Sequence, residues 1–478
     1  MEYLEIIRPY ALIIYYVFIS VIILLIVLDN KKPEKSFAFV LLILLVPVFG
    51  VIIYLLFGAQ YQRKKLFTKK RYFEKVYISS IDRDEELMPL SSTHSNYSRI
   101  PSLFFNLDQV NFTLKNDLRL LINGEEKFPS LIHDLENAQQ SIHLVYYIIE
   151  DGNIGQTIID ILCKKAVEGV SVKLVYDDVG SSLSRASLKQ LKESGVEAFP
   201  YMPVLFSRLA YKANYRNHRK IVIIDNEIGY LGGMNIKDKY INTPDSTLYW
   251  RDTHIRIQGA SVIDLQYLFI SDWYLVSGEK FDLGKVTYRP NAEVNSTIPV
   301  SILGSDYDKN NQIIREAFFA MIMAAKEELL ISTPYFIPDE TILTALTISA
   351  KSGIRIRLII PEKPDIKTAY FASQTYLKAL IQIGVEVYLY HKGMMHSKTM
   401  VIDGVFCTVG STNMDQRSFS LNAEVNAFIL DNTFAAEMKR SFEEDLKFTH
   451  SLSIEDLQNR KWYIKVICSI ARLLAPVL

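Results

Sequence analysis

The chain reads HRKIVIID at residues 218–225 and HSKTMVID at residues 396–403. Each stretch leads to two small residues and an asparagine, GGMN at 232–235 and GSTN at 410–413. Both copies thus follow the pattern His-x-Lys-x4-Asp and place an Asn seventeen residues after the His. A single His beside a Lys is common on a protein surface. Two copies that agree at five spaced positions instead indicate a duplicated functional motif.

The similarity between the two halves extends beyond the motifs. Residues 166–176 correspond to 350–360, because both pair an Ala-x-x-Gly turn with an apolar strand pattern. Residues 195–201 correspond in the same way to 384–390. Short apolar strands alternate with helical stretches in both halves, which is typical of α/β sheets. We therefore predict two similar α/β domains, packed as a pseudo-twofold pair that brings the two motifs together at the shared interface.

Two long uncharged runs stand near the N-terminus, Tyr10–Leu28 and Phe37–Phe57. A helix rises 1.5 Å per residue, so each run would be about 30 Å long, the thickness of the hydrocarbon layer of a membrane. A cleaved signal peptide would have a shorter apolar core and a small-residue cleavage site. The sequence therefore predicts a transmembrane hairpin of two helices.

Positive charge flanks this hairpin unevenly, with more Lys and Arg after the second run than in the turn. By the positive-inside rule, both ends of the hairpin and the whole soluble part of the chain should face the cytoplasm. The same cations are suited to attract anionic membrane lipid, an interpretation compatible with the first. The turn contains Lys31, Lys32 and Lys35, and the later segment contains Arg63, Lys64, Lys65, Lys69, Lys70, Arg71 and Lys75.

The predicted organisation has five segments. The apolar C-terminal segment, with Trp462 and Tyr463 among a few cations, is compatible with a membrane-surface helix or with packing on the domain. The segments are the hairpin at 1–60, a basic juxtamembrane linker at 61–115, the first domain at 116–290, the second domain at 291–450 and the C-terminal segment at 451–478.

Composition excludes several classes of protein. Lys+Arg and Asp+Glu both total 53, so no excess of positive charge points to a nucleic-acid partner. Three cysteines, Cys163, Cys407 and Cys468, lie far apart and form neither a disulfide framework nor a metal-binding knuckle. No two histidines have metal-ligand spacing, and the motif lysines would repel a cation, so we predict neither a metal nor another cofactor.

The motifs themselves indicate phosphoryl chemistry. If each motif forms a strand, His and Lys share one face, while Asp225 or Asp403 faces away and supports the scaffold. Two histidines, two lysines and two asparagines suit a phosphodiester and the extra negative charge of its transition state. One imidazole can attack phosphorus while the other protonates the leaving oxygen. The expected intermediate is a covalent phosphohistidine, resolved by an alcohol or by water.

From about residue 116 to 450 these motifs resemble the phospholipase D superfamily. With the hairpin, the WRDTH stretch at 250–254 and the RLLAP stretch at 472–476, nearly the whole chain resembles the bacterial cardiolipin synthases. The resemblance implies a multi-pass protein of the bacterial cell membrane that condenses two phosphatidylglycerols into cardiolipin and glycerol without a cofactor. The oligomeric state is left open.

The resemblance also implies roles for individual residues. His218 would be the nucleophile and His396 the general acid/base. Glu424, 28 residues after His396, and Asp252, 34 residues after His218, would each orient the histidine of their own half. The catalytic motifs comprise His218, Lys220, Asp225, His396, Lys398 and Asp403, and the substrate-binding residues are Asn235, Asn413, Gly410 and Ser411.

Several residues near the motifs keep two interpretations. Arg251 and Arg417 could clamp a headgroup or form structural ion pairs. His254 and His391 are expected to be ordinary polar residues, and Tyr335 is expected to pack in the interior.

Other activities remain alternatives at this point. A phospholipase D-type hydrolase would use the same intermediate with water as the acceptor and release phosphatidic acid. A phosphodiesterase acting on nucleic acid fits poorly with the neutral charge and the hairpin. A non-catalytic membrane scaffold would be expected to have lost His or Lys from one motif.

Overall fold

The computed structural model describes residues 2–28, 33–54, 70, 73, 97, 99–108, 110–203, 215–244, 246, 248–281, 294, 296–306 and 312–475. The chain divides into two compact units, which are considered separately. One contains the N-terminal helices, and the other comprises Lys70–Val204 and Lys212–Leu478. Both predicted domains belong to this second unit, called here the catalytic unit. The boundary predicted at residue 290 lies outside the described residues.

The N-terminal unit contains three helices, α1 (Glu2–Leu28), α2 (Pro33–Leu45) and α3 (Pro47–Ile53). The prediction of one continuous helix across 37–57 is wrong over its described part. Pro47 lacks a backbone N–H, and the helix is interrupted between α2 and α3. A Cβ at Gly50 would lie 2.7 Å from the Cα of Ile43, so α3 folds closely against α2. Over the residues described, no helix is long and apolar enough to cross a membrane.

The first half of the catalytic unit forms a seven-stranded sheet in the order β1-β9-β7-β6-β2-β3-β4. Strands β2, β3 and β4 are parallel, and the others pair antiparallel. These strands are β1 (Asn116–Ile122), β2 (Ser141–Tyr146), β3 (Ser171–Asp177), β4 (Glu197–Tyr201), β6 (Lys220–Ile224), β7 (Ile228–Gly232) and β9 (Thr253–Gly259).

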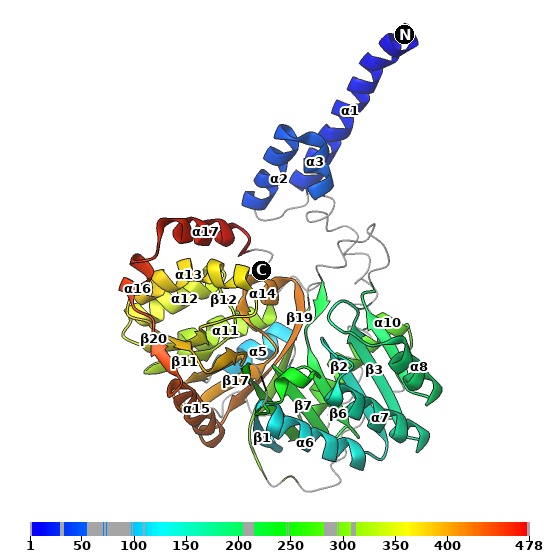
Figure 1. The fold of residues 1–478 in the computed structure, drawn as a ribbon, viewed down its shortest axis with the longest axis vertical. Helices are drawn as coiled ribbons and strands as arrows, with labels where there is room; N and C mark the ends of the chain where they lie inside the picture. Colours follow the sequence, from blue (N-terminus) through cyan, green and yellow to red (C-terminus); the bar gives the residue numbers. More distant parts are fainter. Residues whose placement is uncertain are drawn as a thin grey trace. The chain divides into compact units, whose positions relative to one another are not determined.

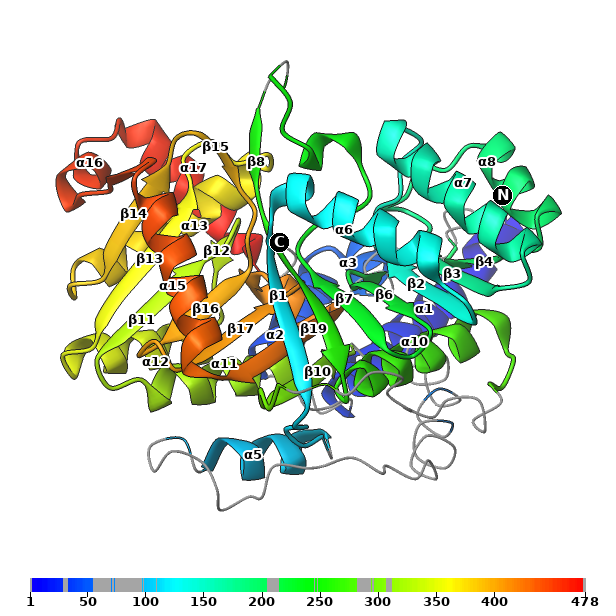
Figure 2. The same ribbon diagram turned by 90° about the horizontal axis from the view of Figure 1, so that it is seen from below.

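The second half repeats this order as β10-β19-β17-β16-β11-β13-β14 and adds β20 at the edge. The shared order confirms the predicted duplication of an α/β unit. Strands β7 and β9 pack against β17 and β19, so the sheets lie side by side (Figure 2). The second sheet contains β10 (Val300–Ser305), β11 (Glu328–Ser332), β13 (Arg355–Pro361), β14 (Glu386–Tyr390), β16 (Thr399–Ile402), β17 (Phe406–Gly410), β19 (Asn422–Leu430) and β20 (Thr449–Ser451).

Helices cover the sheets, and each half has its own apolar core beneath them (Figure 1). The first half carries α6 (Asn123–Asn137), α7 (Asn153–Val167), α8 (Arg185–Glu193), the 3-10 turn η4 (Asp238–Tyr240) and α10 (Val262–Ser277). The second carries α11 (Ile313–Ala324), α12 (Glu340–Lys351), α13 (Lys367–Ile381), α14 (Gln416–Ser420), α15 (Asn432–Leu446), α16 (Ile454–Gln458) and α17 (Trp462–Leu473).

Parts of the predicted linker pack on the catalytic unit. Helix α5 (Arg99–Asp108) buries Phe104 in the core of the second half, and nearby Tyr97 donates a hydrogen bond to Asp403 at 2.7 Å. Phe73 stacks on Tyr274 of α10 with ring centroids 4.1 Å apart. The end of the linker is therefore part of the folded unit.

Lys70 corrects one detail of the predicted basic cluster. Its side chain is only 1% exposed, and Nζ lies 2.9 Å from Asp272 and 3.1 Å from Asp306. It is therefore buried in an ion-pair network and does not face membrane headgroups. The other six residues of that cluster lie outside the described part of the chain.

Candidate active site

Two short strand pairs cross between the halves and build the site. Strand β5 (Arg216–Asn217) pairs in parallel with β19, so that Asn217 lies opposite Ala423. Strand β15 (Gly393–Met395) pairs in parallel with β8 (Tyr249–Arg251), so that Met395 lies opposite Arg251. Each motif histidine is the next residue after its crossing strand. The register therefore places each histidine beside the next residue of the other half.

His218 is held by Glu424 through this register. Nδ1 of His218 lies 3.0 Å from both carboxylate oxygens of Glu424, and the backbone N–H of His218 donates to Ala423. Ser411 Oγ donates to the same carboxylate at 2.5 Å. Because a carboxylate only accepts, Nδ1 carries the proton and Nε2 keeps a free lone pair.

His396 is held in the same way by Asp252. Nδ1 of His396 lies 2.6 Å from Oδ2 of Asp252, and the backbone N–H of His396 donates to Arg251. Oδ1 of Asp252 accepts from the backbone N–H of Thr253 at 2.7 Å. A Cβ at Gly233 would lie 2.1 Å from that Oδ1 atom, so only glycine leaves room for this carboxylate.

The predicted pairing of acid and histidine within each half is therefore wrong. Glu424 contacts His218 rather than His396, and Asp252 contacts His396 rather than His218. The reason is the strand exchange, because β5 and β15 leave their own sheets and pair with strands of the other half.

The motif lysines bond back to the histidines, and the histidines themselves lie outside regular strand geometry. His218 lies between β5 and β6, and His396 lies between β15 and β16, so neither histidine is in a strand. Nζ of Lys220 donates to the carbonyl of His218 and Nζ of Lys398 to that of His396, both at 2.5 Å. Nζ of Lys398 also lies 3.0 Å from Nδ1 of His396.

Burial dominates the protonation of these groups. It lowers the pKa of His218 and of His396 to about 4, partly offset by Glu424 and Asp252 respectively. Burial also lowers the pKa of Lys220 to about 7 and that of Lys398 to about 8. Both imidazoles are therefore neutral at pH 7. A bound phosphodiester anion would raise all four pKa values.

Although burial alone would raise the pKa of each carboxylate, the histidine and lysine beside it outweigh that effect. His396 and Lys398 lower the pKa of Asp252, and His218 and Lys220 lower that of Glu424. Both acids are thus held ionised beside their histidines.

Both histidines line one cavity of about 360 Å³. The predicted substrate-binding residues Asn235 and Asn413 line it too, whereas Gly410 and Ser411 do not. Ser411 serves Glu424 instead. The remaining lining residues are Tyr147, Ile148, Arg216, Lys239, Tyr240, Tyr335, Ile337, Asp365, Ile366, Ala369, Asp415, Arg417, Ser418 and Asn422.

The motif aspartates do not line the cavity, and their contacts match the scaffold role expected for them rather than the place among the catalytic residues. Asp225 accepts hydrogen bonds from the backbone N–H groups of residues 139–141, and Asp403 does the same for residues 326–328. Both have φ of 52° at the turn that follows the motif strand. Each ties that turn to the start of the neighbouring strand.

The intervening residue of each motif also bridges the halves. Arg219 is fully buried, pairs with Asp272 and Asp306, and donates to the carbonyl of Glu424. The hydroxyl of its counterpart Ser397 accepts a hydrogen bond from Arg251 and shares another with the hydroxyl of Thr253. Strand periodicity would point both positions away from the face that the motif His and Lys share.

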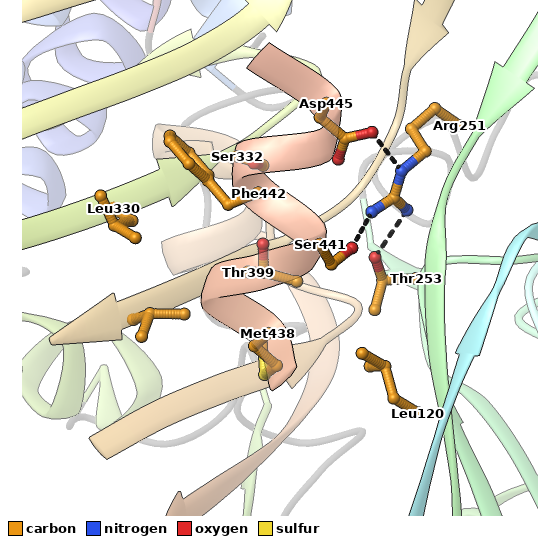
Figure 3. A pocket seen from close by; sticks show the side chains of 11 residues that line it. Leu120, Arg251, Thr253, Leu330, Ser332, Thr399, Met438, Ser441, Phe442 and Asp445 are labelled. Carbon is orange, nitrogen blue, oxygen red and sulfur yellow. Dashed lines mark hydrogen bonds and ion pairs between the residues drawn. The ribbon is translucent and has the colours of Figure 1, made fainter. Parts of the chain in front are cut away.

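Arg251 forms a structural ion pair and does not line the cavity, which supports the second of the two interpretations that the sequence left open for it (Figure 3). Nε of Arg251 lies 2.7 Å from Oδ1 of Asp445, and its other nitrogens donate to Ser441 and Thr253. It thereby fastens β8 to α15. Arg417, by contrast, lines the cavity.

Sequence reasoning did not place aromatic side chains around the two histidines. The ring of Tyr147 stands edge-on to that of His218, with centroids 4.9 Å apart. The ring centroids of Trp250 and Tyr240 lie 5.2 and 5.9 Å from that of His396. Tyr335, expected to be interior packing, lines the cavity and donates to Asp365 at 2.5 Å. These residues come from four separate segments of the chain, and no spacing links them to the motifs.

Comparison with known families gives matches over most of the chain. The family model described as cardiolipin synthase, PLD-like domain, matches residues 131–258 and 318–446. The model described as phospholipase D-nuclease N-terminal matches residues 12–58.

Individual relatives agree with this result. Cardiolipin synthase 2 of Bacillus anthracis is 37% identical over 453 residues, which is 94% of this chain and 88% of that protein. Cardiolipin synthase of Halalkalibacterium halodurans is 38% identical over 470 residues, 97% of this chain and 92% of that protein. The crystal structure of phosphatidylserine synthase from Haemophilus influenzae shares the fold, with a TM-score of 0.61 and 17% identity over 80% of this chain and all of that one.

Proposed function

The chain belongs to the cardiolipin synthase family with two phospholipase D-like domains, and we propose that it transfers a phosphatidyl group between two phosphatidylglycerol molecules. The products are cardiolipin and glycerol. The observation that carries the proposal is the pair of crossed histidine–carboxylate contacts on one cavity.

In the first step, Nε2 of His218 attacks the phosphorus of the donor lipid. The P–N bond forms as the bond from phosphorus to the glycerol oxygen breaks, and His396, protonated when the anion is bound, gives its proton to that oxygen. Glu424 keeps Nδ1 of His218 protonated and stabilises the positive charge that develops on the ring.

In the second step, a terminal hydroxyl of the acceptor attacks the phosphohistidine. His396 is now neutral and takes the hydroxyl proton, the P–O bond forms, and the P–N bond to His218 breaks. Lys220, Lys398, Asn235 and Asn413 stabilise the negative charge of both transition states. Over the cycle, the proton that His396 gives to glycerol is replaced by the proton of the acceptor hydroxyl, and no electron is transferred.

The chain's place at the membrane follows from the same proposal. We infer that α1 and the α2–α3 pair hold the enzyme on the bacterial cell membrane, with the catalytic unit at the cytoplasmic face. Support comes from the uncharged run Tyr10–Leu28 and from the highly exposed apolar side chains along α1, among them Ile14 and Leu28.

The test is to incubate the purified chain with phosphatidylglycerol vesicles in chelator and to identify the lipids by mass spectrometry. Cardiolipin with an equal amount of glycerol is expected. Phosphatidic acid without cardiolipin would mean that water is the acceptor, and the chain would then act as a phospholipase D-type hydrolase.

A further inference from the structure

Helix α17 presents a wide apolar face to its surroundings. Seven large apolar side chains on and just after this twelve-residue helix are exposed. Contiguous exposed apolar surface of this kind marks an interaction site rather than ordinary protein surface. The exposed side chains are Trp462 (76%), Tyr463 (43%), Val466 (46%), Ile467 (40%), Ile470 (57%), Leu473 (74%) and Leu474 (47%).

The outer face is separate from the face by which α17 is docked. Cys468, Ala471 and Ala475 are buried and recur every three or four residues, which places them on one side of the helix. Ala471 and Ala475 pack against Ala369 and Ala372 of α13, beside which α17 lies in Figure 1. The exposed face is therefore additional to what holds the helix in place.

The composition of this face favours a lipid surface over water or a protein partner. Trp and Tyr, here Trp462 and Tyr463, favour the boundary between hydrocarbon and water. Exposed Lys461, Lys465 and Arg472 flank the apolar face and are suited to anionic headgroups. At 1.5 Å per residue α17 is about 18 Å long, too short to cross a bilayer but suited to lie in its interface.

The helix is also continuous with the wall of the catalytic cavity. The small cluster that binds α17 to α13 includes Ile337 and Ala369, and both of these line the cavity. Ile366, just before α13, lines the cavity and is 44% exposed. The side chains of Ile337 and Ala369 thus connect the docked face of α17 to the cavity that both histidines line.

We propose that the outer face of α17 lies in the headgroup layer of an anionic membrane and holds the mouth of the cavity against the lipid surface. A lipid substrate could then present its headgroup to the two histidines while its acyl chains stay in the bilayer. The benefit to catalysis rests on the proposed function, whereas the membrane contact itself does not.

The first experiment measures the surroundings of Trp462 in the full chain, reconstituted in vesicles of phosphatidylcholine and phosphatidylglycerol. The other two tryptophans, Trp250 and Trp273, are at most 3% exposed, and subtraction of the Trp462→Phe spectrum isolates the signal of Trp462. We expect lipids brominated near the headgroup end of their acyl chains to quench at least half of this signal. Aqueous iodide should leave it unchanged.

Two outcomes would overturn the proposal. Quenching by iodide alone would place Trp462 in water, and quenching by neither reagent would mean that protein covers it, either a second copy or the chain's own N-terminal helices. The same measurement in a His218→Ala background separates this inference from the proposed function, because membrane contact does not require turnover.

A second experiment compares two substitutions that add the same charge to α17. Ile470→Asp alters the outer face, and Ser469→Asp alters the exposed polar side of the same helix. We expect Ile470→Asp to lower turnover of vesicle substrate about tenfold and to leave turnover of detergent-dispersed substrate unchanged, with little effect of Ser469→Asp on either. An equal loss on both substrates for Ile470→Asp would contradict a role at the membrane surface.

Discussion

His218 and His396 stand in equivalent positions of the two halves, but different side chains hold them. His218 faces a Glu that Ser411 also contacts, whereas His396 faces an Asp packed against Gly233. The longer acid occurs with the hydroxyl, and the shorter acid occurs where the backbone must approach closely. In each half, the length of the acidic side chain therefore fits the small residue beside it, Ser411 for Glu424 and Gly233 for Asp252.

The comparison also shows how the halves depend on each other. Each acid packs against the small residue of its own half and serves the histidine of the other half. Neither half contains a complete histidine–carboxylate pair, so one half alone could not catalyse the reaction. The strand exchange makes the duplicated unit a single active site.

The largest expected effect comes from removing either histidine. His218→Ala and His396→Ala should each lower cardiolipin formation about 10⁴-fold, because one removes the proposed nucleophile and the other the proposed general acid. A donor with a 4-nitrophenol leaving group separates the roles, since it needs no acid. His396→Ala should then still release a burst of nitrophenol, while His218→Ala should release none. The reverse pattern would exchange the two roles.

Amide substitutions of the acids test the crossed pairing. Glu424→Gln and Asp252→Asn should each lower kcat about 10²-fold, because an amide can donate to Nδ1 and shift the proton of the imidazole onto Nε2. With the nitrophenyl donor, only Glu424→Gln should reduce the burst. Loss of the burst in Asp252→Asn alone would instead support the pairing of each acid with the histidine of its own half. Asp225→Asn, outside the cavity, serves as a control for general damage.

The small residues beside the acids should differ in importance. Gly233→Ala would force the Asp252 carboxylate away from His396, with an expected loss of about 10²-fold in kcat. Ser411→Ala removes one hydrogen bond to the charged Glu424 carboxylate, and a loss at the lower end of the usual range, about 1.5 kcal/mol, predicts roughly a tenfold lower kcat. Thermal unfolding of both variants distinguishes a displaced acid from a protein that fails to fold. Equal activity of the two variants would show that the approach at Gly233 is not required.

Substitutions of the two intervening motif residues, Arg219 and Ser397, should differ in their effect on the stability of the protein rather than on the reaction. Arg219→Met leaves the buried carboxylates of Asp272 and Asp306 with one cation fewer, which predicts a loss of about 3–5 kcal/mol of unfolding free energy. Ser397→Ala removes neutral hydrogen bonds and should cost about 1 kcal/mol. Urea unfolding in detergent measures both. Equal losses would mean that the Arg219 network does not hold the halves together.

Much of the site could be predicted from local patterns. The two histidines, the two asparagines and the scaffold role of Asp225 and Asp403 follow from residue type and strand periodicity within short stretches. The carboxylates Glu424 and Asp252 could be found, but their partners could not. They contact histidines 206 and 144 residues away, and no local spacing specifies a strand that leaves its own sheet.

The sequence by itself determined the duplication, the α/β class and the chemical groups available, because periodicity and residue type belong to contiguous segments of chain. The tertiary structure decided which acid serves which histidine, that Lys70 is buried rather than free for headgroups, and that α17 has two separate apolar faces. These properties depend on the register of parallel strands from different halves and on the packing of segments that meet only in the folded chain.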